Sequence, residues 1–132
     1  MLHNIHRIIL SFFLLLLLSK PALAQKDAFI IVVAAEGIEI TSQISKVAAR
    51  APYFLFFDEQ NNLLQIEVNP YGNAAGGAGP KAALFLAEKK INLIIAEQFG
   101  HKMLDALKQQ TIETVKRHGS VIDAVKEQNH GQ

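Results

Sequence analysis

The sequence lacks cysteine and tryptophan altogether, and its 132 residues include only 8 glycines and 4 prolines. Without cysteine the chain has no disulfide framework, no thiolate zinc site and no cysteine-ligated iron–sulfur cluster. Half of the residues are hydrophobic, which excludes a disordered, collagen-like or low-complexity chain. The length suits one domain with its own core, and no internal repeat or second domain is visible.

The sequence also has no large excess of charge of either sign, since it contains 13 lysines and arginines and 12 acidic residues. Arg7 and Lys20 lie in the first 24 residues, which contain no acid, so residues 25–132 carry 11 basic and 12 acidic groups and a net charge of −1. A nucleic-acid-binding protein usually gathers its cations on one face or in a run, and no such run occurs here. The composition therefore predicts no nucleic-acid partner.

The first 24 residues have the layout of a secretory signal peptide. Arg7 precedes the 11-residue block 8–18, apolar except for one serine, and an Ala-x-Ala cleavage site ends at Ala24. A spanning helix needs about 20 apolar residues, so this block is too short for one. We predict cleavage after Ala24 and a periplasmic or secreted single domain over residues 25–132, not integral to the membrane. An uncleaved N-terminal anchor is the alternative.

Short apolar runs alternate with amphipathic segments in the rest of the chain. The run 29–35 is apolar throughout, which favours a central strand with both faces buried and with 92–96 beside it and parallel. In segment 63–68 apolar and polar residues alternate, as in a strand with one buried and one solvent-exposed face. The order of segments predicts an α/β fold with a mixed five-stranded sheet and helices on its faces. Strands are expected at 29–35, 53–57, 63–68, 92–96 and 111–115. Helices are expected from Pro80 to about Lys90, around Met103–Leu107 and after Ser120, with a shorter helical turn after Thr41 or Ser42 that buries Ile44, Val47 and Ala48.

The most informative segment is the glycine-rich loop 69–79, which leads into the helix expected to begin at Pro80. Glycine lets backbone N–H groups approach a ligand, and N–H groups at a helix N-terminus attract anions. Lys81 in the first turn could add a positive charge. The alternative is a flexible crossover loop with an unimportant lysine. The P-loop pattern is not met, because Gly79 is followed by Pro80 and not by lysine.

Two histidines and one arginine are further candidates. His101 follows the predicted strand 92–96 and His118 follows the strand 111–115, so both loops are expected at the sheet edge where open α/β sheets bind ligands. Each could ligate a metal, or be an ordinary helix-start or surface histidine. Arg50 could hold an anion or pair with an acid, and Met103 is expected in the core. Carboxylates are scattered and no serine elbow motif occurs, so the sequence predicts no enzyme.

The chain resembles the dinitrogenase iron–molybdenum cofactor biosynthesis family, of the NifX/NafY type, over about residues 28–128. The resemblance rests on Arg50-Ala51-Pro52-Tyr53-Phe54, on Asn69-Pro70 leading to Gly76-Gly77-Ala78-Gly79, on Asn92-Leu93-Ile94-Ile95-Ala96, and on Gly119-Ser120-Val121 with Ala124-Val125. It implies a three-layer ribonuclease-H-like fold and non-covalent binding of an anionic metal–sulfur cluster, such as an iron–molybdenum cofactor precursor or a molybdenum–copper sulfide. Val47 stands where members commonly carry histidine, and Ala49 where they carry glycine. A signal peptide is a further departure, since nitrogenase cofactor assembly is cytoplasmic.

The combined interpretation is a non-catalytic carrier of an anionic metal or metal–sulfur cluster. The residues expected to bind the cluster are Arg50, Gly76, Gly77, Gly79, Lys81 and His101, with His101 and His118 as possible metal ligands. The alternative is an interaction module that keeps the fold, has lost the cluster site and binds a partner protein through exposed aromatics of the hairpin, namely Phe54, Phe56 and Phe57.

Overall fold

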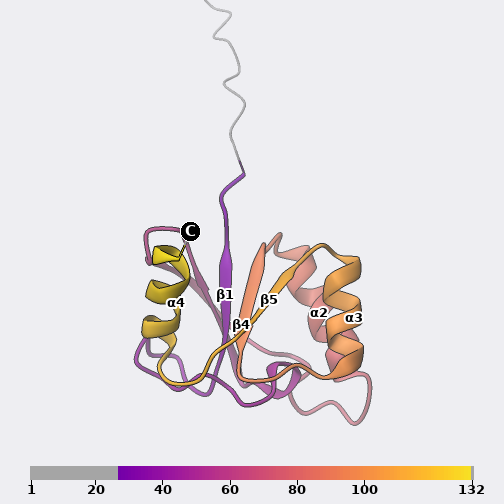
Figure 1. Cartoon of the computed structure of the whole chain (residues 1–132). Coiled ribbons are helices and arrows are strands. Elements are labelled where there is room, and N and C mark those ends of the chain that lie inside the picture. Colours follow the sequence, from indigo (N-terminus) through magenta and orange to yellow (C-terminus); the bar gives the residue numbers. More distant parts are fainter. Residues whose placement is uncertain (1–26, 132) are drawn as a thin grey trace, which may run out of the picture.

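A computed structural model describes residues 27–131, so the predicted signal peptide lies outside the described residues (Figure 1). Within 27–131 no helix is long and apolar enough to cross a membrane. The elements, in chain order, are β1 (Ile31–Ala35), the 3₁₀ turn η1 (Ala48–Arg50), β2 (Tyr53–Phe57), β3 (Leu63–Val68), α2 (Ala78–Glu88), β4 (Leu93–Ala96), α3 (His101–Gln109), β5 (Glu113–Lys116) and α4 (Val121–His130).

The five strands form one mixed sheet in the order β3-β2-β1-β4-β5, which confirms the predicted α/β fold. β1 is central and pairs in parallel with β4, as expected, and β4 pairs in parallel with β5. β2 is antiparallel to both β1 and β3. Four of the five strands therefore end at the same edge of the sheet, which we call the carboxyl edge. β3 and β5 are the two outer strands.

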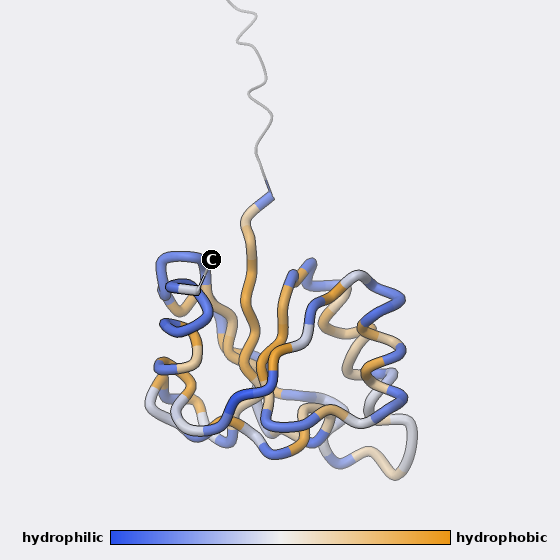
Figure 2. The backbone as a smooth tube through the Cα atoms, viewed as in Figure 1, coloured by the Kyte–Doolittle hydropathy of each residue, from blue (hydrophilic) through white to orange (hydrophobic). Residues whose placement is uncertain are grey.

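Two hydrophobic cores lie on opposite faces of the sheet, giving three layers (Figure 1). Side chains of α2 and α3, such as Leu86 and Met103, pack on one face with Val32 of β1. Val125 of α4 packs on the other face with Val33. The alternation of a strand sends neighbouring residues to opposite faces, so β1 is apolar throughout because both faces are covered. Figure 2 shows this hydrophobic centre and the hydrophilic outer sides of the helices.

α2 and α3 both begin at the carboxyl edge and return along the same face of the sheet. α2 connects the end of β3 to the start of β4, and α3 connects the end of β4 to the start of β5. Because these strands are parallel, the two helices run in the same direction, side by side (Figure 1). Their N-termini therefore meet at one corner of the molecule.

Three local predictions were wrong. α2 begins at Ala78, two residues before Pro80, because proline is tolerated throughout a first turn whose N–H groups have no helical partner. The turn expected to bury Val47 is instead a short 3₁₀ turn that starts after it, and Val47 is 41% exposed. In β3 the apolar side chains of the expected buried face are exposed, because β3 is an outer strand and α4 packs against the central β1.

Candidate functional site

The N-terminus of α2 is built from glycines. Gly77 is its N-cap and has φ 69° and ψ 18°, a left-handed conformation that side-chain-bearing residues rarely adopt. No side chain caps this end, and its first turn contains no acidic residue. A Cβ added at Gly77 would lie 3.7 Å from Cε of Lys81, so the lysine side chain extends back over the helix N-terminus. The end of α2 thus presents backbone donors beside an ammonium group.

The N-terminus of α3 lies against it. A Cβ at Gly79, the second residue of α2, would come within 3.0 Å of Cβ and 3.1 Å of the backbone nitrogen of Met103. Only glycine allows this approach without displacing α3. Gly100 is the N-cap of α3, and this end also has no capping side chain and no acid in its first turn. We call residues 77–81 and 100–103 together the helix corner.

The glycine-rich loop is held in place by two polar side chains that do not belong to it. Nη1 of Arg50 donates to the carbonyls of Gly72 at 3.2 Å and Ala74 at 2.5 Å. Nδ2 of Asn69, which is only 6% exposed, donates to the carbonyls of Ala49 at 3.0 Å and Ala51 at 2.9 Å. Arg50 therefore fixes the loop backbone with at least part of its guanidinium.

Asn69 is a positioning residue to which the sequence analysis assigned no role of its own. Its Oδ1 accepts from the N–H of Tyr71 at 3.0 Å, the local bond typical of asparagine at a turn, while its amide reaches η1. The available signal was the Asn-Pro pair directly after a predicted strand, which marks a turn. That pattern gave no indication that the side chain would be buried.

The loops that carry the two histidines leave the same carboxyl edge of the sheet, as predicted, and lead into helices on opposite faces. His101 is the first residue of α3, and its Nε2 lies 3.4 Å from Oδ2 of Asp105 one turn later, with the imidazole 88% exposed. His118 precedes α4, which packs on the opposite face of the sheet from α3. Throughout residues 27–131 no group of three or more histidines and carboxylates could hold a metal ion. Met103 is fully buried, as predicted.

Val47 lies close to the loop that precedes the N-terminus of α3. It forms a parallel bridge with Gln98, and the N–H of Ala48 donates to the Gln98 carbonyl at 3.0 Å. Position 47, where the family resemblance predicts histidine, thus lies next to the β4–α3 loop. This chain presents a half-exposed apolar side chain there instead of an imidazole.

The aromatic residues of the hairpin are buried and do not form a surface. Phe54 and Phe57 are fully buried and Phe56 is 4% exposed. Phe54 and Phe56 pack beneath α2 and α3, whereas Phe57 packs on the α4 side. The interaction module that was expected to use exposed aromatics of this hairpin is therefore contradicted.

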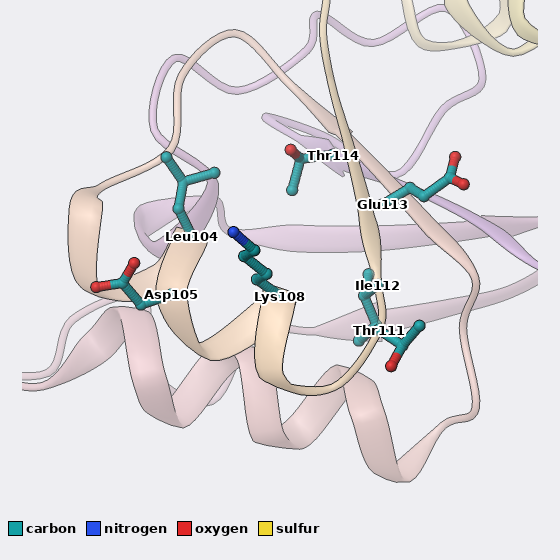
Figure 3. Close-up of a pocket in the computed structure, with 7 residues that line it drawn as sticks. All are labelled: Leu104, Asp105, Lys108, Thr111, Ile112, Glu113 and Thr114. Carbon is teal, nitrogen blue, oxygen red and sulfur yellow. The ribbon is translucent and has the colours of Figure 1, made fainter.

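A separate groove of about 610 Å³ runs between α3 and the outer strand β5 (Figure 3). Its charged lining consists of Lys108 with Asp105 and Glu113. Two carboxylates beside one ammonium repel a multiply charged anion. Asp105, which lies 3.4 Å from His101, also lines this groove, but none of the residues predicted to bind the cluster does.

These features define a small α/β protein with two helix N-termini paired at the carboxyl edge of its sheet. A model of the family described as dinitrogenase iron-molybdenum cofactor matches residues 29–131, and the chain belongs to this family. NifX-like members are generally carriers and not enzymes, so membership suggests a cofactor-binding or carrier role in iron–molybdenum cofactor biosynthesis, with a metal–sulfur cluster as cargo.

Solved structures show the same fold. The apo orange protein from Desulfovibrio gigas is 24% identical, with a TM-score of 0.73 over 82% of this chain and 92% of that one. A proposed NifB protein from Thermotoga is 26% identical, with a TM-score of 0.67 over 80% and 90%. A proposed dinitrogenase from Methanocaldococcus jannaschii is 14% identical, with a TM-score of 0.56 over 80% and 92%. No curated protein sequence matches significantly.

Proposed function

We propose that this protein is a non-catalytic carrier that binds an anionic metal–sulfur cluster, of the iron–molybdenum cofactor or molybdenum–copper sulfide class, at the helix corner. We further propose that it does so outside the cytoplasm, after removal of residues 1–24. Family membership supports a cluster as cargo, and the chemistry of the corner supports an anion.

The observation that carries the proposal is the contact between the first turns of α2 and α3. Each helix N-terminus is equivalent to about half a positive charge, and its first N–H groups have no helical acceptor. Gly79 allows the two ends to meet, with Met103 about 3.0 Å from where its Cβ would lie. Neither first turn contains a carboxylate that would neutralise this field. A multiply charged anion supplies the missing negative charge.

Side chains around the corner add charge of the same sign. Lys81 extends over Gly77, and Lys102 is exposed in the first turn of α3. Arg50 acts mainly on the loop, whose carbonyls at Gly72 and Ala74 it binds. Charge-assisted hydrogen bonds contribute about 1.5–3 kcal/mol each, so three or four give roughly micromolar affinity after the cost of association.

The donor set favours an intact anion over a bare metal ion. The chain has no cysteine, Met103 is fully buried, and Val47 stands where the family resemblance predicts an imidazole. The corner offers N–H groups and cations, which bind the sulfide or oxo surface of a preformed cluster. His101 is the one candidate at the corner that could also ligate a metal.

Reconstitution tests the binding site. We would add tetrathiomolybdate, with and without copper, to the purified protein, and measure the molybdenum and the visible absorption that co-elute with it on gel filtration. We expect stoichiometric binding that Lys81→Gln weakens about tenfold, in keeping with the loss of one charge-assisted contact. Lys108→Gln, at the other end of α3, is the matched control and should bind normally. Equal affinities for the two variants would place the anion elsewhere.

The location needs its own test. Expression from the natural start codon in a Gram-negative host, followed by fractionation and mass determination, should give a periplasmic protein beginning at Gln25. Recovery in the cytoplasm with the first 24 residues intact would contradict export and leave the proposed cluster site unaffected.

A further inference from the structure

β3 is an outer strand whose large apolar side chains are exposed. Among residues 27–131, eight large hydrophobic side chains are exposed, and four of them belong to this six-residue strand. Their exposed fractions are 38% for Leu63, 52% for Leu64, 41% for Ile66 and 67% for Val68. We call this strand the β3 edge. A cluster of exposed apolar side chains on a monomer commonly marks an interface.

The β3 edge also presents unpaired backbone groups. The N–H of Asn69 donates to the carbonyl of Pro52 at 3.0 Å, so this pair is hydrogen-bonded across β2 and β3. Successive antiparallel pairs alternate between bonded and non-bonded, which makes Val68 opposite Tyr53 and Ile66 opposite Leu55 non-bonded pairs. The N–H and C=O groups of Val68 and Ile66 therefore point away from the sheet.

The usual protection of an outer strand is weak here. Between Leu63 and Val68 there is no lysine and no proline, and the single charge, Glu67, is paired with Lys89 at 2.9 Å. The register shift between Phe56 and Phe57 leaves Leu64 as an extra residue without a partner in β2, so regular pairing covers Gln65–Val68. Within that stretch the outward-facing backbone groups are those of Ile66 and Val68, and a two-fold axis at Ile66 avoids placing Glu67 opposite Glu67.

We propose that two copies of this protein pair antiparallel through the β3 edge, about a two-fold axis at Ile66. Ile66 then faces Ile66 of the second copy, and Leu64 faces Val68, so apolar side chains meet on one face. On the other face Gln65 meets Glu67, an amide opposite a carboxylate that Lys89 already neutralises, and no like charges oppose. The two sheets become one continuous sheet.

Introduced cysteines test both the dimer and its register, because the chain has no cysteine of its own. Residues opposite each other in a bonded antiparallel pair have Cα atoms about 5.5 Å apart, within the range of a disulfide. Ile66→Cys should therefore form a disulfide-linked dimer on mild oxidation. Val68→Cys lies about 14 Å from its own copy in this register and should stay largely monomeric. Crosslinking through Val68→Cys or Gln65→Cys in preference to Ile66→Cys would overturn the Ile66-centred pairing.

The mass in solution tests association without any crosslink. Sedimentation equilibrium of the processed protein, over a concentration series, should show a mass rising toward twice that of the monomer. Ile66→Lys places two ammonium groups face to face and should abolish the rise, whereas Thr114→Lys on the outer strand β5 should leave it unchanged. A monomeric mass at every concentration up to about 1 mM would refute the proposal. Tetrathiomolybdate binding by Ile66→Lys should be normal, so the outcome is independent of the cluster site.

Discussion

The helix corner and the β3 edge both expose unpaired backbone N–H groups, yet they suit opposite partners. At the corner the N–H donors of both helices point the same way, glycines leave them uncovered by side chains, and neither first turn contains a carboxylate. Along β3 the donors alternate with carbonyl acceptors and are flanked by Ile66 and Val68. The first arrangement attracts an anion and the second another strand. What surrounds a backbone group decides what it binds.

The largest effect on stability is expected from a bulky side chain at the contact between α2 and α3. Gly79→Leu puts a side chain where Met103 already lies about 3.0 Å from the Cβ position, so α2 and α3 must separate. We expect the free energy of unfolding to fall by about 3 kcal/mol, the upper end for overpacking, in chemical denaturation. Gly76→Ala is the control, because a Cβ there meets nothing within 4 Å. Equal stabilities would show that the helices do not touch as described.

A second way to weaken the corner is to release the loop that precedes it. Asn69→Ala removes two hydrogen bonds that a buried side chain donates to the carbonyls of Ala49 and Ala51. We expect the free energy of unfolding to fall by about 2 kcal/mol in chemical denaturation. Hydrogen exchange should also show faster exchange of the backbone amides of residues 70–77. Asn73→Ala, in the same loop but exposed, should change neither. Unaltered exchange in Asn69→Ala would mean that Arg50 alone holds the loop.

On the β3 edge, by contrast, a drastic substitution should cost little stability. Ile66→Lys changes a side chain that is 41% exposed and leaves the bonds between β2 and β3 in place. We expect the free energy of unfolding of the monomer to change by no more than about 0.5 kcal/mol, measured at a concentration where the wild type is also monomeric. A loss of several times that value would show that Ile66 supports the monomer's own core.

The smallest effect concerns the ion pair beneath the edge. The hydrogen bond from Lys89 lowers the pKa of Glu67 from its ordinary value of 4.5. The pair therefore stabilises the fold above that value, and its contribution is lost as the pH falls through the folded-state pKa. Glu67→Gln should be slightly less stable than wild type at neutral pH and equal to it in acid. Glu88→Gln, without an ion pair in the described structure, is the control, and a difference independent of pH would contradict this account.

The sheet could be predicted from the sequence, because its signals are local. An apolar run such as Ile31–Ala35 needs cover on both faces, and the capping residues Ser120 and Asp123 mark the start of α4, where the N–H of Asp123 donates to Oγ of Ser120 at 3.3 Å. The exposure of β3 could not be predicted in the same way. Alternation shows that one face is apolar but does not reveal whether a helix covers it.

The candidate site was predicted only in part, because it depends on contacts between segments distant in sequence. The glycines and Lys81 were apparent from composition and spacing, but the contact of Gly79 with Met103 joins two different helices. The helices that follow His101 and His118, α3 and α4, cover opposite faces of the sheet, and neither loop sequence indicates which face its helix will cover. Arg50 was singled out for its charge, whereas the structure shows its hydrogen bonds to loop carbonyls.

The parallel course of α2 and α3 has an energetic consequence for the protein before it is loaded. Two helix dipoles aligned side by side repel, and no carboxylate in either first turn relieves that repulsion. An anion bound at the corner, as proposed, would relieve this repulsion and bind only the folded state, so it should raise the melting temperature of the protein.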